Sequence, residues 1–347
     1  MVTTLVGDFG GTNARLALST EEGITGVREF KCSDFPDPSA IVNSYIGTRD
    51  VEKIDHGVFA VAGASEDPEN VTFTNGPWAQ RGVNFTNCEI DVVETINDFE
   101  AICYSISALK PEDTLKIVAG TQPFFPSLYL ADEKTYTDNP TRLIKSSPEK
   151  RFVVLGPGTG LGVSTGLVTD GGQFLVVGGE GGHSDFSPST DDELYLKEYL
   201  ESIDKIVSLE TIASGTGLAT VFNARCDMLD IPTRIQDASE LEAQMREGKP
   251  KEVRQAARWT LKLFAKTLGK CAATVTLSSD SRTVFLTGGV VPKLGLTRNL
   301  YVNAFTSAFH NNDLGENNTL KQTPVALITH QQPGLLGASA YGKLARG

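Results

Sequence analysis

The stretch LVGDFGGTNARLAL, from Leu5 to Leu18, decides the fold of this chain of 347 residues. The apolar residues over 3–8 predict a buried strand, the glycine pair before Thr12 predicts a tight turn, and the alternation over 14–19 predicts a second strand. After the turn residues TEEG, residues 24–30 read as a third strand. The chain is therefore predicted to begin as an antiparallel meander with a glycine turn between its first two strands.

The same pattern recurs in the second half of the chain. RFVVLGPGTGLGVSTGLV, residues 151–168, reads as strand, glycine turn and strand, and DGGQFLVVGG supplies a third strand. The recurrence predicts two related lobes, each with a meander and a glycine turn that faces a shared cleft.

Between and after these meanders, strands alternate with helices. The pattern predicts further strands at 57–63, 114–120 and 323–329, a strand that runs into a glycine turn at 282–291, and a strand and short turn that precede the helix at 99–109. It predicts helices at 36–46, 99–109, 191–200, 217–228, 238–247, 252–277 and 334–345, and a helix with Pro292 in its first turn. Strands followed by helices indicate an α/β architecture. We predict a small α/β domain of 1–110 with 333–347 and a large α/β domain of 111–332 with long helices. Residues 122–150 contain four prolines and read as a long loop or insertion, to which the sequence assigns no role.

The net charge of −12 limits the classes of ligand. It argues against a nucleic-acid or anionic-membrane surface, because both need basic patches. A polyanionic ligand must then be held by backbone amides, helix N-termini and a bridging divalent cation. Five cysteines lie far apart without a C-x-x-C pair, which indicates a reduced, cytoplasmic compartment and no structural zinc site. No apolar run reaches the ~18 residues of a membrane span, and no signal-peptide pattern precedes the first strand.

The glycine turns do not match the common phosphate-binding fingerprints. The chain has no G-x-x-x-x-G-K-[ST] string, so a P-loop is excluded. In GPGTGLG, residues 156–162, the glycines alternate and Leu161 stands where a dinucleotide fold requires its third glycine. The triplet Asp8-Phe9-Gly10 has the letters that hold magnesium in a protein kinase, but it stands at the start of the chain and no H-R-D precedes it. The sequence therefore excludes these three classes of nucleotide-binding protein.

What remains is GDxGGTN at 7–13 and GPGTGLG at 156–162, which resemble the two phosphate loops of the actin/chaperone/sugar-kinase superfamily. LTGGVV at 286–291 resembles its adenosine motif. The resemblance implies a two-lobed actin-like ATPase (ribonuclease H-like) fold, each lobe a mixed sheet with helices, in which glycine lets the backbone approach phosphate. It implies that Asp8 holds Mg²⁺, directly or through a water molecule. The implied ATP-binding residues are Asp8, Gly10, Gly11, Thr12, Asn13, Gly158, Thr159, Gly160, Gly288 and Gly289.

Three further segments carry polar side chains with two interpretations each. In INDFEA, Asn97 and Asp98 stand at a strand–helix junction, where they are either a helix N-cap or the ligands of a substrate hydroxyl, with Asp98 as base. In GEGGHSDF, Glu180 and His183 are either surface residues or ligands whose glycine neighbours permit close approach. In SLETIASGTGL, Glu210 is either a ligand or an acid stabilised by the first turn of a helix.

Taken together, these segments resemble the bacterial-type glucokinase family. The match includes LVGDFGGTNARLAL, TNGPW, INDF, GPGTGLGV, GEGGHSDF, LETIASGTGL, TGGVVPK and PGLLGASA, in the family's order and over almost the whole chain. The resemblance implies a cytoplasmic homodimer that phosphorylates the 6-hydroxyl of D-glucose with Mg·ATP, with Asp98 as the catalytic base. The implied glucose ligands are Asn75, Asn97, Asp98, Glu180, His183 and Glu210.

The residues leave alternatives open. The nearest is a kinase for another hexose or an N-acetylhexosamine, because the sequence does not give the geometry that discriminates between hydroxyl patterns. A chaperone-like ATPase would need no sugar-binding residues, and a non-catalytic sugar sensor would need a DNA-binding segment, for which there is no room before the first strand. The cysteine-rich zinc motif of the related repressor/open-reading-frame/kinase family is absent. ATP is the default phosphoryl donor, with ADP and polyphosphate as alternatives.

Overall fold

The computed structural model describes residues 4–48, 54–64, 67–79, 81–121, 150–169, 172–203, 205–293, 299–311 and 319–345. Its contacts divide the chain into two compact units. The first unit is Met1–Asp113, Phe174–Gly178 and His330–Gly347, and the second is Thr114–Gln173 and Gly179–Thr329. The predicted domain boundaries stay a prediction. The predicted loop at 122–150 lies outside the described residues except for its last residue.

The first unit contains a five-stranded sheet with the order β3-β2-β1-β4-β8. Its strands are β1 (Thr4–Phe9), β2 (Asn13–Thr20), β3 (Gly23–Lys31), β4 (His56–Val61) and β8 (Val92–Asn97). β1, β2 and β3 form the predicted antiparallel meander, and β1, β4 and β8 run parallel. All six residues of β4 are buried, as expected for an interior strand of a covered sheet.

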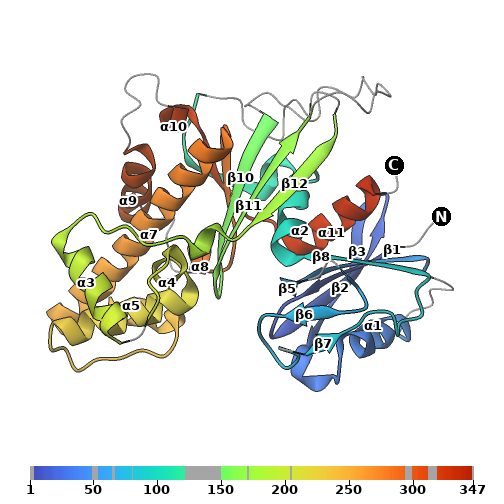
Figure 1. The fold of residues 1–347 in the computed structure, drawn as a ribbon, viewed down its shortest axis with the longest axis horizontal. Helices are drawn as coiled ribbons and strands as arrows, with labels where there is room; N and C mark the ends of the chain where they lie inside the picture. Colours follow the sequence, from blue (N-terminus) through green and yellow to red (C-terminus); the bar gives the residue numbers. More distant parts are fainter. Residues whose placement is uncertain are drawn as a thin grey trace. The chain divides into compact units, whose positions relative to one another are not determined.

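The carboxyl ends of the three parallel strands meet at one edge of this sheet. Phe9 pairs with Val61, and Val61 pairs with Asn97. The glycine turn follows β1 at this edge, and helix α2 (Asp98–Ser105) follows β8 there. The C-terminal helix α11 (Pro333–Leu344) contacts α2, β1 and β4 and is drawn in red beside the blue and teal strands of this unit (Figure 1). Ligands of open α/β sheets bind at this type of edge.

An aromatic cluster fills the core of the first unit. The rings of Phe9, Phe59 and Phe85 lie 4.9–5.6 Å apart between centroids, and all three are fully buried. Helix α1 (Pro38–Ile46) contributes to the same core. A small second sheet, β5 (Gly63–Ala64), β6 (Val71–Phe73) and β7 (Gly82–Val83), was not predicted, because two or three residues are too few to show alternation.

The other sheet has the order β12-β11-β10-β13-β14-β9, and its strands other than β12 belong to the second unit. Its strands are β9 (Thr114–Val118), β10 (Arg151–Pro157), β11 (Leu161–Val168), β12 (Phe174–Gly179), β13 (Thr283–Leu286) and β14 (Val325–Ile328). β10 pairs antiparallel with β11 and parallel with β13, which pairs parallel with β14. Both sheets therefore join three consecutive strands to two parallel strands in the same order. This confirms the predicted repeat and the α/β fold class.

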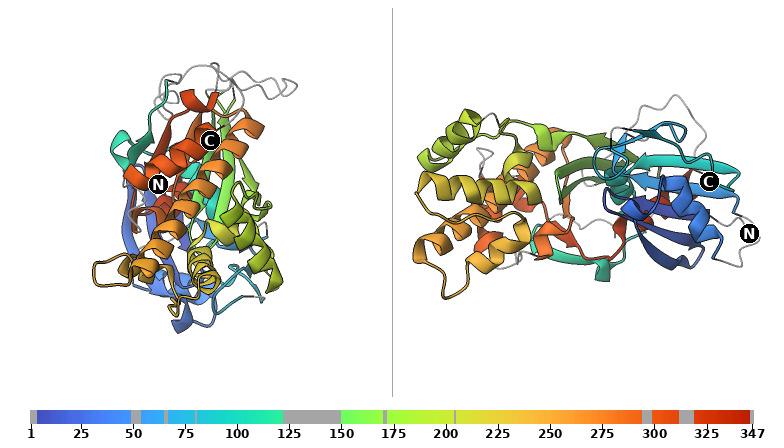
Figure 2. Two further views of the ribbon diagram at one scale, coloured as in Figure 1. Left: turned by 90° about the vertical axis from the view of Figure 1, so that its left-hand side faces the viewer. Right: turned by 90° about the horizontal axis from the view of Figure 1, so that it is seen from below.

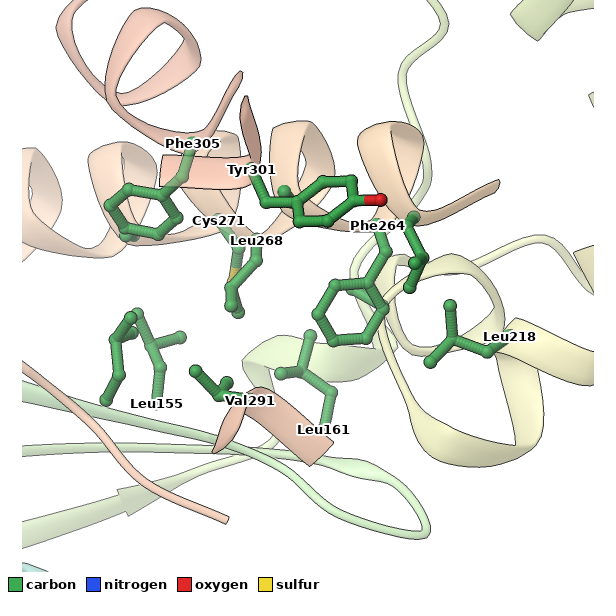
Figure 3. Close-up of a cluster of buried hydrophobic side chains, with 14 of the residues drawn as sticks. Leu155, Leu161, Leu218, Phe264, Leu268, Cys271, Val291, Tyr301 and Phe305 are labelled. Atoms are coloured by element: carbon green, nitrogen blue, oxygen red, sulfur yellow. The ribbon is translucent and has the colours of Figure 1, made fainter. Parts of the chain in front are cut away.

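Helices cover the sheet of the second unit. They are α3 (Asp191–Ser202), α4 (Leu209–Ile212), α5 (Gly215–Met228), α6 (Leu241–Gln244), α7 (Lys251–Ser279), α8 (Val290–Lys293), α9 (Asn299–His310) and α10 (Thr319–Gln322). The long helix α7, drawn in orange, contacts α5 and α9 (Figure 1, Figure 2). Its apolar positions pack into the core shown in Figure 3. Within the described ranges, none of the helices combines the length and the apolar composition that a membrane-spanning helix requires.

Three helices differ from the prediction, and the four-residue α10 is one that was not predicted. The helix predicted at 238–247 is a 3₁₀ turn, Ala238–Glu240, followed by the short α6. Helix α9 was not predicted, although its buried residues Tyr301, Phe305 and Phe309 have the four-residue spacing of a helix face. The other predicted helices and strands are present, with ends that differ by a few residues.

Candidate active site

The first glycine turn joins β1 to β2 at the edge described above. It closes with a hydrogen bond from Gly10 N to Asn13 O of 3.0 Å. A Cβ on Gly11 would lie 3.1 Å from the Asn75 carbonyl carbon, and a Cβ on Gly76 would overlap the Gly11 carbonyl oxygen. Gly76 also has φ +97°, a conformation that strongly favours glycine. The turn and the TNGPW segment are therefore in backbone contact, which places the exposed Asn75 beside the predicted phosphate loop.

Cys32 also stabilises the first glycine turn, through two hydrogen bonds. Its thiol donates to Gly10 O at 3.4 Å, and its backbone N–H donates to Thr12 O at 2.9 Å. The side chain is fully buried, and burial raises the pKa of the thiol to about 11. Sequence reasoning missed this role, because a lone cysteine one strand away carries no motif.

Asp8 is the predicted metal ligand and lies near the end of β1. It is half-buried, and a Cβ on Gly334 would lie 2.7 Å from its Cγ and Oδ2. The carboxyl group therefore lies against the first turn of α11, whose partial positive charge favours an anion. Burial raises the pKa of Asp8, and the charge of Arg15 partly opposes that rise.

Asp98 is the predicted base and is the first residue of α2. Burial and the negative charge of Asp8 raise the pKa of Asp98 to about 7, although the Phe99 N–H favours the ionised form. The two carboxyl groups thus interact electrostatically within the first unit. A base with a pKa near the working pH is well suited to proton transfer.

Asn97, which precedes Asp98, is the N-cap of α2. Its Oδ1 accepts from Phe99 N at 2.9 Å and from Glu100 N at 3.3 Å, and its Nδ2 donates to Gly63 O at 3.2 Å. In the structure, Asn97 therefore acts as a helix N-cap, which is one of its two interpretations from the sequence. The amide nitrogen of Asn97 carries two hydrogens, and the bond to Gly63 uses one of them.

The second glycine turn joins β10 to β11 in the second unit. Pro157 pairs with Leu161, and Gly158 N donates to Gly160 O at 2.8 Å across the turn. Three further bonds hold it from outside. Gly215 N donates to Gly158 O at 2.7 Å, the Thr216 hydroxyl donates to Thr159 O at 3.0 Å, and Leu161 N donates to Glu210 Oε2 at 2.7 Å.

Glu210 therefore bonds to the second glycine turn rather than to the N–H groups of its own short helix, α4. Its other oxygen, Oε1, lies 3.7 Å from His183 Nε2. His183 Nδ1 in turn lies 3.0 Å from Glu180 Oε2. The side chains of Glu180 and His183 are 88% and 64% exposed, so both are accessible to a ligand.

The adenosine motif follows β13 in the second unit. Thr287 N donates to Leu155 O at 2.8 Å, which extends the pairing of β13 with β10. Gly288 has φ +86° and lies against the Pro157 carbonyl, next to the second glycine turn. Gly289 is exposed beside the Lys293 ammonium group.

The predicted residues thus form one group in each unit. The first unit brings together Asp8 with Asp98, and Gly11 with Asn75; the second brings together Gly158, Thr159, Gly160, Glu180, His183, Glu210 and Gly288. Sequence reasoning missed Cys32, Thr216 and Gly334 as supporting residues. Thr216 and Gly334 had a signal, because they lie in the LETIASGTGL and PGLLGASA segments that formed part of the resemblance.

Comparison with known proteins supports the resemblance. A sequence profile of the family described as Glucokinase matches residues 5–345. The glucokinase of Xylella fastidiosa strain 9a5c is 32% identical over 350 residues, which cover 98% of this chain and 94% of that protein. The crystal structure of glucokinase from an Antarctic psychrotroph is 25% identical with a TM-score of 0.75, and each chain covers 100% of the other. Glucokinase from Balamuthia mandrillaris, solved with glucose, shares the fold with a TM-score of 0.76 at 22% identity, over 100% of this chain and 94% of that one.

Proposed function

This chain belongs to the glucokinase family, whose enzymes phosphorylate glucose with ATP, and we propose that Asp98 is the general base of that reaction. The observation that carries the proposal is the environment of Asp98 at the start of α2, which raises its pKa to about 7. A substantial fraction of the carboxyl group is then ionised at neutral pH and can accept a proton from a hydroxyl group.

Asp98 would orient the 6-hydroxyl of glucose and accept its proton as the γ-phosphoryl group of ATP is transferred. Phosphoryl transfer needs mainly positioning and stabilisation of charge, so a single base of matched pKa is sufficient for the proton. The Asn97 cap and the Phe99 N–H keep the first turn of α2 in place around this carboxyl group.

The remaining hydroxyls of glucose would be bound by residues of both units. In the first unit these are the exposed Asn75 and the remaining amide N–H of Asn97. In the second unit they are Glu180, His183 and Glu210. The imidazole of His183 lies between the two carboxylates, 3.0 Å from Glu180 Oε2 and 3.7 Å from Glu210 Oε1. Carboxylates suit this task because each oxygen accepts hydrogen bonds from hydroxyl groups.

ATP would be bound by the two glycine turns and the adenosine motif. The N–H groups of Gly10, Gly11, Thr12, Asn13 and of the turn at 158–160 would donate to phosphate oxygens, with Gly288 and Gly289 beside the adenosine. Asp8 fits a magnesium site, because Mg²⁺ is commonly bound by one or two carboxylates together with substrate phosphates. When bound there, Mg²⁺ would neutralise part of the phosphate charge.

We also propose a cytoplasmic homodimer. None of the five cysteines forms a disulfide, which agrees with a reducing compartment. Light scattering after size-exclusion chromatography measures the oligomeric state directly: the mass of two chains supports the proposal, and the mass of one chain contradicts it.

A coupled assay for sugar 6-phosphate tests the proposed function. It compares glucose, mannose, fructose, galactose and N-acetylglucosamine with Mg·ATP, with ADP and polyphosphate as alternative donors. Strong preference for glucose and ATP, lost when Mg²⁺ is chelated, is the expected result. Turnover of another sugar alone would identify that sugar, rather than glucose, as the substrate. Hydrolysis of ATP without any sugar would contradict the proposed function.

A further inference from the structure

We propose that Glu210 positions the second glycine turn in addition to binding the sugar, so that one carboxylate couples the affinities for sugar and nucleotide. The sugar-binding part of this inference rests on the proposed function. The positioning part does not, because it concerns bonds within the second unit.

The two oxygens of Glu210 have different neighbours. Oε2 accepts from Leu161 N at 2.7 Å, a short bond in which the acceptor is charged. Oε1 lies 3.7 Å from His183 Nε2, and the side chain is 32% exposed. A carboxylate offers roughly four lone-pair positions, so Glu210 can bind a sugar hydroxyl without releasing Leu161.

The turn is shaped to receive this carboxylate. A Cβ on Gly160 would overlap Glu210 Oε2, so a side chain at this position would displace the carboxylate. On the neighbouring segment, a Cβ on Gly182 would overlap the Leu161 carbonyl oxygen. The backbone of Leu161 is therefore held between Glu210 and the turn that carries His183.

Leu161 connects this contact to the rigid core. Its side chain is 4% exposed and lies in the same apolar cluster as Leu218 and Val291 (Figure 3). Val291 is the last residue of the predicted adenosine motif, and Leu218 belongs to α5. The N–H group that donates to Glu210 thus belongs to a residue whose side chain is fixed in the core. This hydrogen bond therefore fixes the position of the backbone at the end of the turn.

Thr216 holds the turn through a hydrogen bond that involves none of the proposed sugar-binding residues. Its hydroxyl donates to Thr159 O at 3.0 Å from the first turn of α5. Gly215, Thr216 and Glu210 bond to Gly158, Thr159 and Leu161 respectively. Three of the four residues from 158 to 161 therefore have a hydrogen bond to a residue outside the turn. Thr216 therefore separates the positioning role from the sugar-binding role.

The coupling follows from these contacts. A sugar that binds Glu210 restricts its side chain and with it the turn, so a nucleotide that binds afterwards loses less conformational freedom. By linkage, the nucleotide raises the affinity for sugar by the same factor. Removal of the carboxylate should abolish the coupling as well as weaken both affinities.

Isothermal titration of the full-length protein with a non-hydrolysable ATP analogue and Mg²⁺, and separately with glucose, tests the proposal. Glu210→Ala should weaken the nucleotide affinity measured without sugar by about tenfold, because a charged hydrogen bond is lost. Glu210→Gln retains an oxygen for Leu161 N–H and should restore most of that loss, while glucose affinity stays weak. Thr216→Val should weaken nucleotide binding about threefold and leave glucose binding unchanged.

Thr220→Val is the matched control, because its hydroxyl bonds within α5 to Thr216 O at 3.2 Å and does not reach the turn. Thermal melting of each variant verifies that it folds. Unchanged nucleotide affinity in a folded Glu210→Ala protein would overturn the positioning role, as would equal losses in Glu210→Ala and Glu210→Gln. Failure of the wild-type protein to bind glucose would overturn the proposed function and the coupling, and the nucleotide titrations alone would still decide the positioning role.

Discussion

The first glycine turn is held by neutral groups, whereas the second is held in part by a carboxylate. In the first turn, the backbone of Asn75 and Gly76 packs against Gly11, and the thiol of Cys32 bonds to Gly10. In the second, Glu210 and Thr216 bond to Leu161 and Thr159. Two turns of similar sequence and equivalent place in their sheets therefore depend on different interactions.

The difference also separates two reasons for glycine. Gly76 is required by packing and by its positive φ, whereas a Cβ on Gly158 would meet no atom within 4 Å. A glycine that the protein itself does not require is open to a ligand. We therefore propose that Gly158 serves the approach of a phosphate group, whereas Gly76 serves the fold of the first unit.

The largest effect should come from Gly76→Ala. The positive φ and the overlap with Gly11 should lower the free energy of unfolding by about 2–4 kcal/mol. Gly158→Ala is the matched variant and should leave the melting temperature nearly unchanged while it weakens nucleotide binding. Chemical denaturation and nucleotide titration measure both effects. Equal destabilisation by the two substitutions would refute the distinction.

The pH dependence of stability should have opposite signs in the two units. The raised pKa of Asp98 means that the folded state favours its protonated form, so its ionisation costs stability as pH rises from its ordinary value near 4 through about 7. Asp98→Asn should therefore raise the melting temperature at pH 8, and the gain should vanish near pH 4.

Glu193 in α3 provides the opposite case. Burial alone would raise its pKa, but hydrogen bonds from Lys266 and Ser189 lower it. Its stabilisation is complete above the unfolded pKa near 4 and is lost as pH falls through the lower folded value. Glu193→Gln should thus lower the melting temperature at pH 7, and this effect should shrink as the pH falls below 4.5. Melting curves from pH 2 to 8 that show the same sign for Asp98→Asn and Glu193→Gln would contradict this contrast.

The smallest effect should come from Cys32→Ala. Loss of a weak thiol bond and of a buried sulfur should lower the free energy of unfolding by about 1 kcal/mol and weaken nucleotide binding about threefold. Cys226→Ala is a control that removes a buried sulfur from the core of the second unit. If Cys226→Ala weakens nucleotide binding as much as Cys32→Ala does, the effect of Cys32→Ala does not come from its hydrogen bonds to the first turn.

Much of this architecture could be predicted from local pattern. The two meanders, the glycine turns, α7 and the strand–helix junction at Asp98 all have periodicity or turn chemistry that short stretches reveal. The bonds of Glu210 to Leu161, of Cys32 to Gly10 and of Thr216 to Thr159 could not be predicted. They join residues 49, 22 and 57 positions apart, and only the folded chain brings them together. The cap made by Asn97 was one of two interpretations that its sequence neighbours allowed.

The pH dependence of kcat/KM for glucose tests the central claim most directly, because it reports the ionisation of groups in the free enzyme. With Asp98 as the general base, kcat/KM should fall tenfold per pH unit below an apparent pKa of about 7. Asp98→Asn should lower kcat by about 10²–10⁴-fold and remove this limb. A wild-type profile that is flat from pH 5.5 to 8, or an Asp98→Asn enzyme with nearly full kcat, would contradict the account.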